Sequence, residues 1–260
     1  MRLHLSGWVA LGSVPAGVAL LLLRRWPPGA LAAGWVAAAG FAVSLAASPP
    51  LAAVSTGLLG KNTATGALPL WSRLAFAPYH SALRLRLAST RARSAEPRAD
   101  AIVGTDWYLG GWPAAPGDLP PGVVAILDVT AELPRTVAGP GLPYRCLPVW
   151  DTWAPATPAI QASLDWAAAA VRAARKKEGG RVYVHCANGH GRSAVLAVAR
   201  VLEGGGGGGT VDGAVAVVQG SRPRSRLNAR QRAAVEAWWA WRRGKGKEEV
   251  VKAAGRGGDL

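Results

Sequence analysis

The chain is poor in cysteine and histidine, with two and four residues among 260. A structural zinc site takes four ligands, usually Cys and His. His185, Cys186 and His190 lie close together in the sequence, but no second Cys/His pair lies near them, so we expect no metal site. Cys146 falls in a short apolar run, where a small buried residue is the ordinary interpretation. A redox partnership between the two cysteines is the weaker alternative.

Charged side chains are missing from two long N-terminal stretches, 5–23 and 26–60. A helix that crosses a bilayer needs about 20 apolar residues. We therefore predict a membrane region over residues 1–60, with two transmembrane helices at about 5–23 and 30–48. One helix after a removed leader, and a buried or re-entrant hairpin, are the alternatives. A signal peptide is disfavoured because its apolar core would be long.

Acidic residues are scarce: 15 Asp and Glu stand against 30 Lys and Arg, for a net charge of +15. Such an excess of positive charge is typical of proteins that bind nucleic acid or an anionic lipid surface. The adjacent apolar stretches favour the membrane. We expect no nucleic-acid partner. Residues 61–98 are interpreted as a basic juxtamembrane linker, whose charge predicts that the following domain lies on the reducing side, cytosolic or equivalent. The membrane of an organelle is one of the alternatives. The Arg24-Arg25 pair, in the short loop between the two predicted helices, argues mildly against placing the domain on the reducing side.

The glycine-containing loop His185–Ser193 has the clearest chemical pattern. Cys186 precedes Arg192 by six positions, and the loop joins a predicted strand, Arg181–Val184, to a predicted helix, Ser193–Leu202. At the start of a helix the free backbone N–H groups and the macrodipole favour an anion, whether thiolate or phosphate. Only the thiolate is a good nucleophile. We predict that Cys186 attacks phosphorus and that the planar Arg192 guanidinium binds two phosphoryl oxygens.

The remaining loop residues are predicted to form the cradle. Gly189 and Gly191 let the backbone curl so that successive N–H groups point inward. The Ser193 hydroxyl is placed to donate to the sulfur and make it a better leaving group, and His185 is expected to order the loop from behind. The predicted phosphate-binding residues are Ala187, Asn188, Gly189, His190, Gly191 and Arg192.

An acid is also needed, because an alkoxide or phenoxide leaves poorly. Asp151 stands between two tryptophans after the apolar run Leu147–Trp150, which we predict to be a strand. Aromatic surroundings are expected to raise the pKa of its carboxyl group. The alternative is a turn or capping residue before the following helix, for which Thr157 is the expected N-cap. We predict that Asp151 is the general acid.

Several other segments have predicted structural roles. Asp128 ends a predicted strand, Val123–Leu127, and is expected to organise the next turn. The six glycines of Gly204–Gly209 are interpreted as a flexible surface connector, and Thr210 as a cap for the helix after it. The tryptophans of Trp238–Trp241 either lie at a membrane interface or pack on the domain.

The block from about Ile102 to Ala240 resembles a dual-specificity protein tyrosine phosphatase domain. His185–Ser193 is similar to the phosphate-binding loop of that family, and Asp151 stands in the place of its general acid. Ile102–Gly111 resembles its first strands and Ser221–Pro223 its late Arg-Pro turn. More narrowly, the chain resembles membrane-anchored members with N-terminal hydrophobic helices, in which Gly60-Lys61, Gly66–Pro69 and Pro78–His80 have counterparts.

Together these features predict an α/β cysteine-phosphatase fold, with a central, mostly parallel sheet flanked by helices and preceded by transmembrane helices. The catalytic domain is placed at 99–243 and a disordered basic tail at 244–260. We expect a phosphomonoester hydrolase that works through a phosphocysteine intermediate without metal or cofactor. Its expected substrates carry phosphotyrosine, phosphoserine or phosphothreonine in proteins. The alternatives are a phosphatase of phosphatidylglycerophosphate or a phosphoinositide, although the loop lacks the lysines of lipid-selective relatives, and a catalytically silent phosphate-binding module at a membrane.

Overall fold

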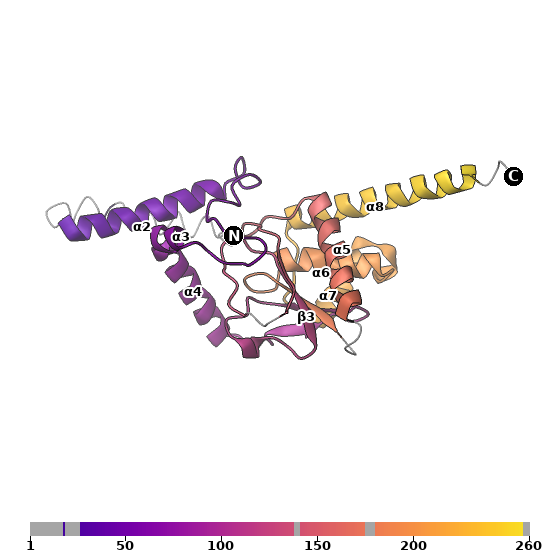
Figure 1. The fold of residues 1–260 in the computed structure, drawn as a ribbon, viewed down its shortest axis with the longest axis horizontal. Helices are drawn as coiled ribbons and strands as arrows, with labels where there is room; N and C mark the ends of the chain where they lie inside the picture. The colour runs from indigo at the N-terminus through magenta and orange to yellow at the C-terminus, as the bar shows by residue number, and fades with distance from the viewer. Residues whose placement is uncertain (1–17, 19–26, 138–140, 175–179, 257–260) are drawn as a thin grey trace.

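The computed structural model describes residue 18 and residues 27–137, 141–174 and 180–256 (Figure 1). The predicted first membrane helix, at 5–23, lies outside the described residues apart from Val18. The elements follow in the order α2, Pro27–Ala46; α3, Leu70–Ala75; α4, Ala77–Ala92; β1, Ala99–Ala101; β2, Trp107–Gly110; β3, Val123–Asp128; β4, Tyr144–Cys146; α5, Thr157–Ala174; β5, Arg181–His185; α6, Arg192–Glu203; α7, Val211–Ser221; and α8, Ala229–Arg256. Short 3-10 turns lie at Pro116–Asp118 and Gly207–Gly209.

The sheet has five strands in the order β1-β2-β5-β3-β4. β1 runs antiparallel to β2, and the other neighbouring pairs are parallel. The central strand β5 places Val184 opposite Leu109 of β2 and Leu127 of β3. These three side chains are fully buried, as expected for parallel strands that are covered on both faces. The prediction of a central, mostly parallel sheet is confirmed.

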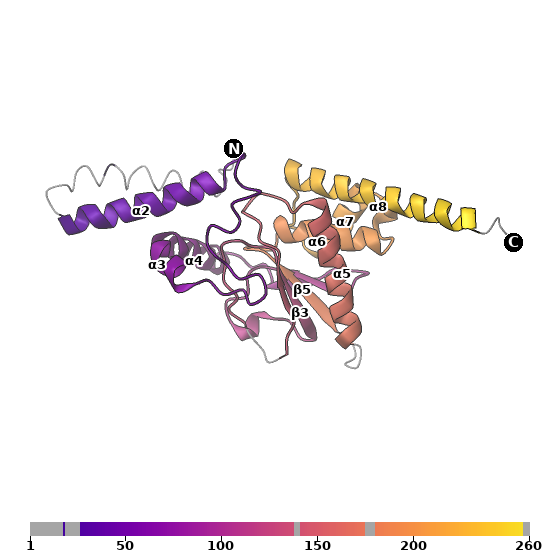
Figure 2. The same ribbon diagram turned by 45° about the horizontal axis from the view of Figure 1, so that its top comes forward.

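Helices lie on both sides of this sheet. Figures 1 and 2 show α5, α6, α7 and α8 gathered on one side and α2, α3 and α4 on the other. α6 is buried along nearly its whole length, which places it at the centre of the main core. α5 begins at Thr157, one residue earlier than predicted, so Thr157 is the first helical residue and not the N-cap; the helix buries Ile160, Leu164 and Ala167. The packing of these helices fixes both ends of the Cys186 loop.

The predicted second membrane segment corresponds to α2. Of the described residues, α2 forms one helix long and apolar enough to cross a membrane. Its C-terminal half packs against the rest of the protein, because Ala39, Val43 and Ala46 are buried. Trp35 Nε1 also donates to the backbone oxygen of Ala75, at 2.7 Å. α2 is thus joined to α3 and α4 by side-chain contacts as well as by the chain.

The segment after Gly60 is built into the fold, although we interpreted it as the start of a linker. Lys61 Nζ lies 2.6 Å from Asp128 Oδ2, and both side chains are almost completely inaccessible to solvent. The backbone N–H of Cys146 donates to the Thr63 oxygen, and that of Arg135 to the Gly66 oxygen, each at 2.9 Å. Lys61 therefore contributes to the core rather than to the positive charge of the surface.

Three local predictions differ from the structure. β4 ends at Cys146 instead of continuing through Trp150, because Pro148 has no N–H to donate to a ladder. The glycine run is not a loose connector, since a Cβ at Gly207, where φ is +63°, would lie 2.2 Å from Ala214 N. α8 runs to Arg256, whereas we expected disorder from Gly244. The Lys, Glu and Ala residues of that tail are good helix formers.

Two other local predictions are settled by contacts. Thr210 Oγ1 accepts a hydrogen bond from Gly213 N at 3.1 Å, so Thr210 caps α7 as predicted. Trp238 is fully buried in the core, and Trp239 Nε1 donates to the Gly209 oxygen at 3.0 Å. Of the two interpretations of the tryptophan run, packing on the domain is the one that the structure supports.

Candidate active site

The Cys186 loop connects the end of β5 to the start of α6. Cys186 Sγ accepts hydrogen bonds from Gly189 N at 3.3 Å and from Ser193 Oγ at 3.2 Å. Gly189 has φ +76°, and a Cβ there would lie 2.5 Å from the backbone of Gly110. A side chain would therefore force the loop away from β2. The tight curl predicted from the glycines is present, and it brings the Ser193 hydroxyl to the sulfur.

The two cysteines have opposite acidities. Burial alone would raise the pKa of Cys186, but the Arg192 charge and the hydrogen bonds from Ser193 and Gly189 outweigh burial and lower it below its usual value. Burial and the nearby Asp128 charge raise the pKa of Cys146 to about 12. Cys186 is therefore the thiol that ionises readily, which is the property a nucleophile requires.

Arg192 is held by a glutamate that the sequence analysis did not single out. Glu132 Oε1 accepts from Arg192 Nη2 at 2.7 Å and Glu132 Oε2 from Arg192 Nη1 at 2.9 Å. Nη1 also donates to the Val149 oxygen at 2.7 Å, and Arg192 and Glu132 are both buried. Burial alone would lower the pKa of Arg192, but the Glu132 and Asp151 charges raise it above its usual value. The guanidinium is permanently charged and fixed in orientation.

One donor of this guanidinium remains unused. Arg192 Nε is buried and has no hydrogen-bond partner among the described residues. A buried donor without a partner costs free energy, and a bound anion would supply the missing acceptor.

Asp151 lies beside the same arginine. Its Oδ1 is 3.3 Å from Arg192 Nη2, and about a third of its side chain is exposed, 35%. Both residues line a pocket of about 250 Å³. The other lining residues are Leu83, Arg86, Leu87, Thr90, Glu132, Ala187, Asn188, His190 and Arg224. The structure therefore brings the predicted acid and the predicted phosphate loop to one pocket, and α4 forms one of its walls.

Behind the loop lies a buried polar cluster centred on Asp128. Its Oδ1 accepts from Thr130 N at 2.9 Å and from Thr130 Oγ1 at 2.7 Å, so Asp128 organises the turn as predicted. Burial would raise the pKa of Asp128, but the Lys61 and His185 charges lower it. His185 is buried, with Nε2 3.9 Å from Asp128 Oδ2 and Nδ1 3.4 Å from the Cys186 oxygen. This places His185 behind the loop, where we expected it.

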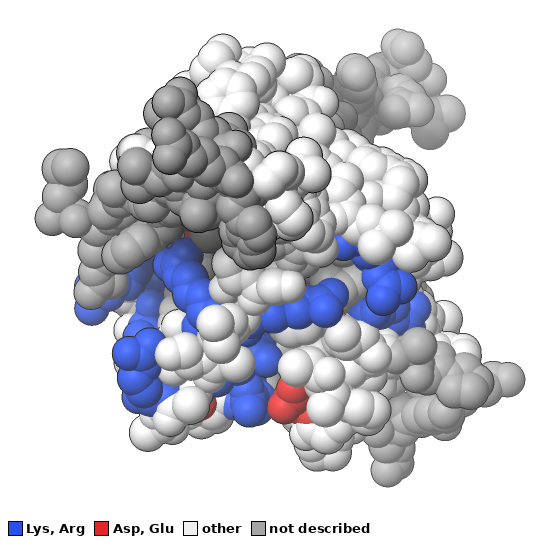
Figure 3. All heavy atoms as spheres, turned by 90° about the vertical axis from the view of Figure 1, so that its left-hand side faces the viewer, with Lys and Arg blue, Asp and Glu red and all other residues white. Residues whose placement is uncertain are grey.

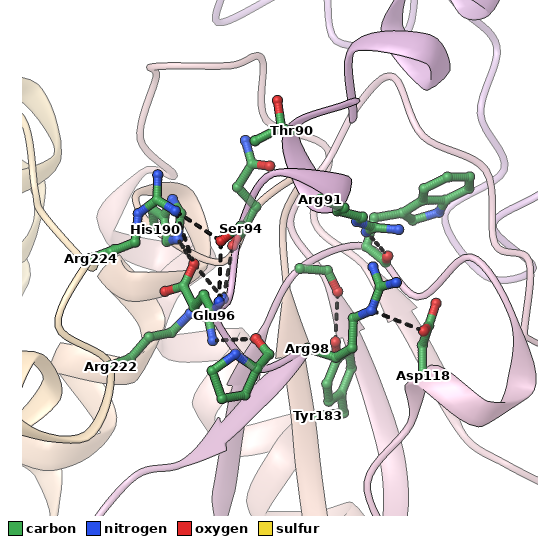
Figure 4. A pocket seen from close by; sticks show the side chains of 14 residues that line it. Thr90, Arg91, Ser94, Glu96, Arg98, Asp118, Tyr183, His190, Arg222 and Arg224 are labelled. Carbon is green, nitrogen blue, oxygen red and sulfur yellow. Dashed lines mark hydrogen bonds and ion pairs between the residues drawn. The ribbon is translucent and has the colours of Figure 1, made fainter. Parts of the chain in front are cut away.

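A second pocket, of about 140 Å³, borders the outer side of the loop (Figure 4). Figure 4 shows Glu96 between His190, Arg222 and Arg224. Glu96 Oε2 lies 2.7 Å from His190 Nε2 and 3.5 Å from Arg222 Nη2. Arg222 also donates to the backbone oxygens of Gly189 and Asn188, each at 3.1 Å. Arg222 therefore holds the carbonyl side of the loop from the outside.

The sequence carried little signal for two of these residues. Glu132 follows β3 by a short turn, and Lys61 lies far from the loop in the chain. A single glutamate or lysine has many ordinary surface roles. Only their complete burial beside a charged partner marks them as parts of the site.

Several solved structures are similar to this chain. Three of the similar solved structures are human DUSP28, Tk-PTP in the active form, and PTPMT1 in complex with PI(5)P. Human DUSP28 is 24% identical, with 56% of this chain and 96% of that chain covered and a TM-score of 0.48. Tk-PTP is 24% identical, with 55% and 97% covered and a TM-score of 0.46. PTPMT1 is 16% identical, with 55% and 96% covered and a TM-score of 0.45.

None of the curated proteins compared with this sequence matches it. The family model described as dual specificity phosphatase, catalytic domain, matches residues 108–238, which is half of the 260-residue chain. This range contains Cys186, Arg192, Asp151 and Glu132, and the chain belongs to the dual specificity phosphatase family.

Proposed function

We propose that this protein is a membrane-attached, cysteine-dependent phosphatase that hydrolyses phosphotyrosine, phosphoserine or phosphothreonine in proteins. The observation that carries the proposal is the Cys186 thiol with a lowered pKa, seated in a curled loop that ends at the fixed Arg192 guanidinium. A thiolate and a buried cation at this spacing match the needs of attack on a phosphate dianion.

In the first step the Cys186 thiolate attacks phosphorus, and an S–P bond forms while the P–O bond to the leaving group breaks. Arg192 and the loop N–H groups bind the three remaining phosphoryl oxygens, which carry the negative charge during transfer. Asp151, in its acid form, gives its proton to the departing oxygen. The products of this step are a phosphocysteine and a neutral alcohol or phenol.

In the second step Asp151, now a carboxylate, removes a proton from water as that water attacks phosphorus. The S–P bond breaks, the electron pair returns to Cys186, and inorganic phosphate is released. The Ser193 hydroxyl, 3.2 Å from Sγ, stabilises the thiolate as it leaves. Both steps use side chains, backbone N–H groups and water.

Attachment to a membrane is supported by two features of the N-terminal side. α2 has no charged residue and exposes Leu31, Phe41 and Leu45. The face that carries α2 to α4 is also strongly basic, as the blue side chains in Figure 3 show. Its exposed cations from α3 onward include Arg73, Arg84, Arg86 and Arg93. Each cation near an anionic lipid surface contributes about 1 kcal/mol to binding.

The catalytic part is placed on the reducing side of that membrane, cytosolic or equivalent, because oxidation would inactivate a thiolate nucleophile. The resemblance to membrane-anchored members of the family points the same way. The basic side chains would then face the anionic lipids of that side.

A phosphorylated lipid is the second candidate substrate, and one observation favours it. The pocket wall contributed by α4 combines Leu83 and Leu87 with Arg86, a mixture that suits an amphiphile. The variable loop positions Ala187, Asn188, His190 and Gly191 include no lysine, which favours the protein substrate.

The test is phosphate release by detergent-solubilised full-length protein, on a phosphotyrosine peptide and on phosphatidylglycerophosphate micelles. Cys186→Ser is expected to abolish release while it still binds inorganic phosphate, and Arg192→Ala to lose both. Cys146→Ser is the matched control and is expected to retain activity. Equal release by wild type and Cys186→Ser would reject the nucleophile. Phosphate binding without any release by the wild type would favour a silent phosphate-binding module instead.

A further inference from the structure

The two tryptophans that flank Asp151 are held by the segment that follows α2. Trp150 is fully buried, and its Nε1 donates to Ser55 Oγ at 3.0 Å. Ser55 Oγ in turn donates to the Ala46 oxygen at 2.6 Å. Trp153 Nε1 donates to the Ala47 oxygen at 3.0 Å. Both indoles are therefore fixed to one short stretch of chain, Ala46–Ser55, which is distant in sequence.

The same loop is also held by Asn228 and by the start of α8. The Thr152 oxygen accepts from Asn228 Nδ2 at 2.8 Å, and the Trp153 oxygen accepts from Gln231 Nε2 at 3.2 Å. The Arg230 guanidinium lies 4.3 Å from the centre of the Trp153 ring. The Ala46–Ser55 stretch thus binds the indole N–H groups of the loop, and the start of α8 binds its backbone and the Trp153 ring.

The loop needs this support because its backbone is strained. Thr152 has φ +69° and is the one non-glycine residue with positive φ among the described residues. A β-branched residue in this conformation costs of order 1 to 2 kcal/mol and persists only where surrounding contacts impose it. Without those contacts, the residue next to Asp151 would relax toward an ordinary conformation and move the carboxyl group.

We propose that Ala46–Ser55 is a positioning segment for the acid: through Trp150 and Trp153 it holds Asp151 beside Arg192. This rests on the proposed function, in which Asp151 protonates the leaving group. The family model begins at residue 108, so the working catalytic unit extends to residues well before it. The segment begins at the last residue of α2, so the two indole hydrogen bonds connect the acid loop to the chain at the end of α2.

The experiment uses full-length protein with Ser55→Ala, Trp150→Phe and Trp153→Phe. Phenylalanine keeps an aromatic ring and removes the N–H donor. Trp239→Phe is the matched control, because it removes an indole hydrogen bond of the same length, to the Gly209 oxygen at 3.0 Å, away from the pocket. For each variant, kcat/KM is measured on nitrophenyl phosphate, whose leaving group needs no acid, and on a phosphoserine peptide, whose alkoxide needs one.

We expect Trp150→Phe and Trp153→Phe to lose about tenfold more kcat/KM on the phosphoserine peptide than on nitrophenyl phosphate, since small displacements of a catalytic group have effects of this order. Ser55→Ala is expected to act in the same direction. Combining Trp153→Phe with Asp151→Asn should add no further selective loss, because both changes act on one proton transfer.

Three outcomes would overturn the proposal. If the Trp150 and Trp153 variants behave like Trp239→Phe on both substrates, the segment does not position the acid. Equal losses of kcat/KM on the two substrates would show that these hydrogen bonds stabilise the fold and do not position the acid. A wild type no more active than Cys186→Ser would instead reject the proposed function itself, and the inference with it.

Discussion

Replacing Glu132 by glutamine tests how the site controls Arg192. Glu132 forms a bidentate pair with the guanidinium, at 2.7 and 2.9 Å, and neither residue is accessible to solvent. Glutamine has nearly the same shape. It retains one acceptor oxygen, but its NH₂ group would face an N–H donor of the arginine. Glu132→Gln therefore removes one charge-assisted hydrogen bond and the negative charge that neutralises a buried cation.

The magnitude follows from these losses. A charge-assisted hydrogen bond contributes about 1.5 to 3 kcal/mol, and breaking one partner of a buried ion pair costs about 3 to 5 kcal/mol. Arg192 keeps the Val149 oxygen and Asp151 as partners, so we expect the lower end, about 3 kcal/mol of unfolding free energy. For a chain of this size that corresponds to a decrease in Tm of about 6 to 12 °C.

We also expect catalysis to slow, because a guanidinium that is free to rotate no longer holds its N–H donors toward the phosphoryl group. We expect kcat/KM to fall about 100-fold, which corresponds to about 2.7 kcal/mol of transition-state stabilisation.

The assay combines chemical denaturation with steady-state kinetics on nitrophenyl phosphate. Glu236→Gln is the control, since Glu236 forms an exposed i,i+4 pair with Arg232 that contributes well under 1 kcal/mol. If Glu132→Gln shifts the denaturation midpoint and kcat/KM no more than Glu236→Gln does, the reasoning about the buried pair is wrong.

Two further predictions concern the cysteines and the buried lysine. Because the folded-state pKa of Cys186 lies below that of an unfolded thiol, its thiolate stabilises the fold at pH values above the unfolded pKa, and this contribution is lost as pH falls through the folded pKa. The lowered pKa also makes Cys186 the more reactive thiol. At neutral pH iodoacetamide should therefore alkylate Cys186 and leave Cys146 largely unlabelled, as measured by mass spectrometry. Equal alkylation rates at the two cysteines would contradict the assignment of Cys186 as the ionised thiol. Lys61→Met leaves the buried Asp128 carboxylate without its counter-charge and should cost about 3 to 5 kcal/mol in denaturation. Arg98→Met, at a half-exposed pair with Asp118, should cost under about 1 kcal/mol, and a similar cost for both would show that Lys61 is not part of the folded unit.

Sequence alone determined the parts of the site that are local in the chain. The Cys186 loop, the strand before it and the helix after it are one continuous segment, and glycine spacing with apolar patterning was sufficient to place them. Asp151 was selected as the carboxylate between two tryptophans that follows an apolar run and precedes a helix, although that run is not a strand. Local hydrogen bonding also sufficed for Thr210 as a cap and for Asp128 as a turn organiser, because each contacts residues within three positions.

The tertiary structure decided every feature that depends on residues distant in the chain. Glu132 reaches Arg192 across 60 positions, and Lys61 reaches Asp128 across 67. Trp150 reaches Ser55 across 95 positions. Charge and hydropathy patterns describe a residue's own neighbourhood, whereas the burial of an ionised side chain depends on which partner the fold places beside it. For that reason the sequence identified a thiol and an arginine, and only the packed structure identified what holds the arginine and the acid loop in place.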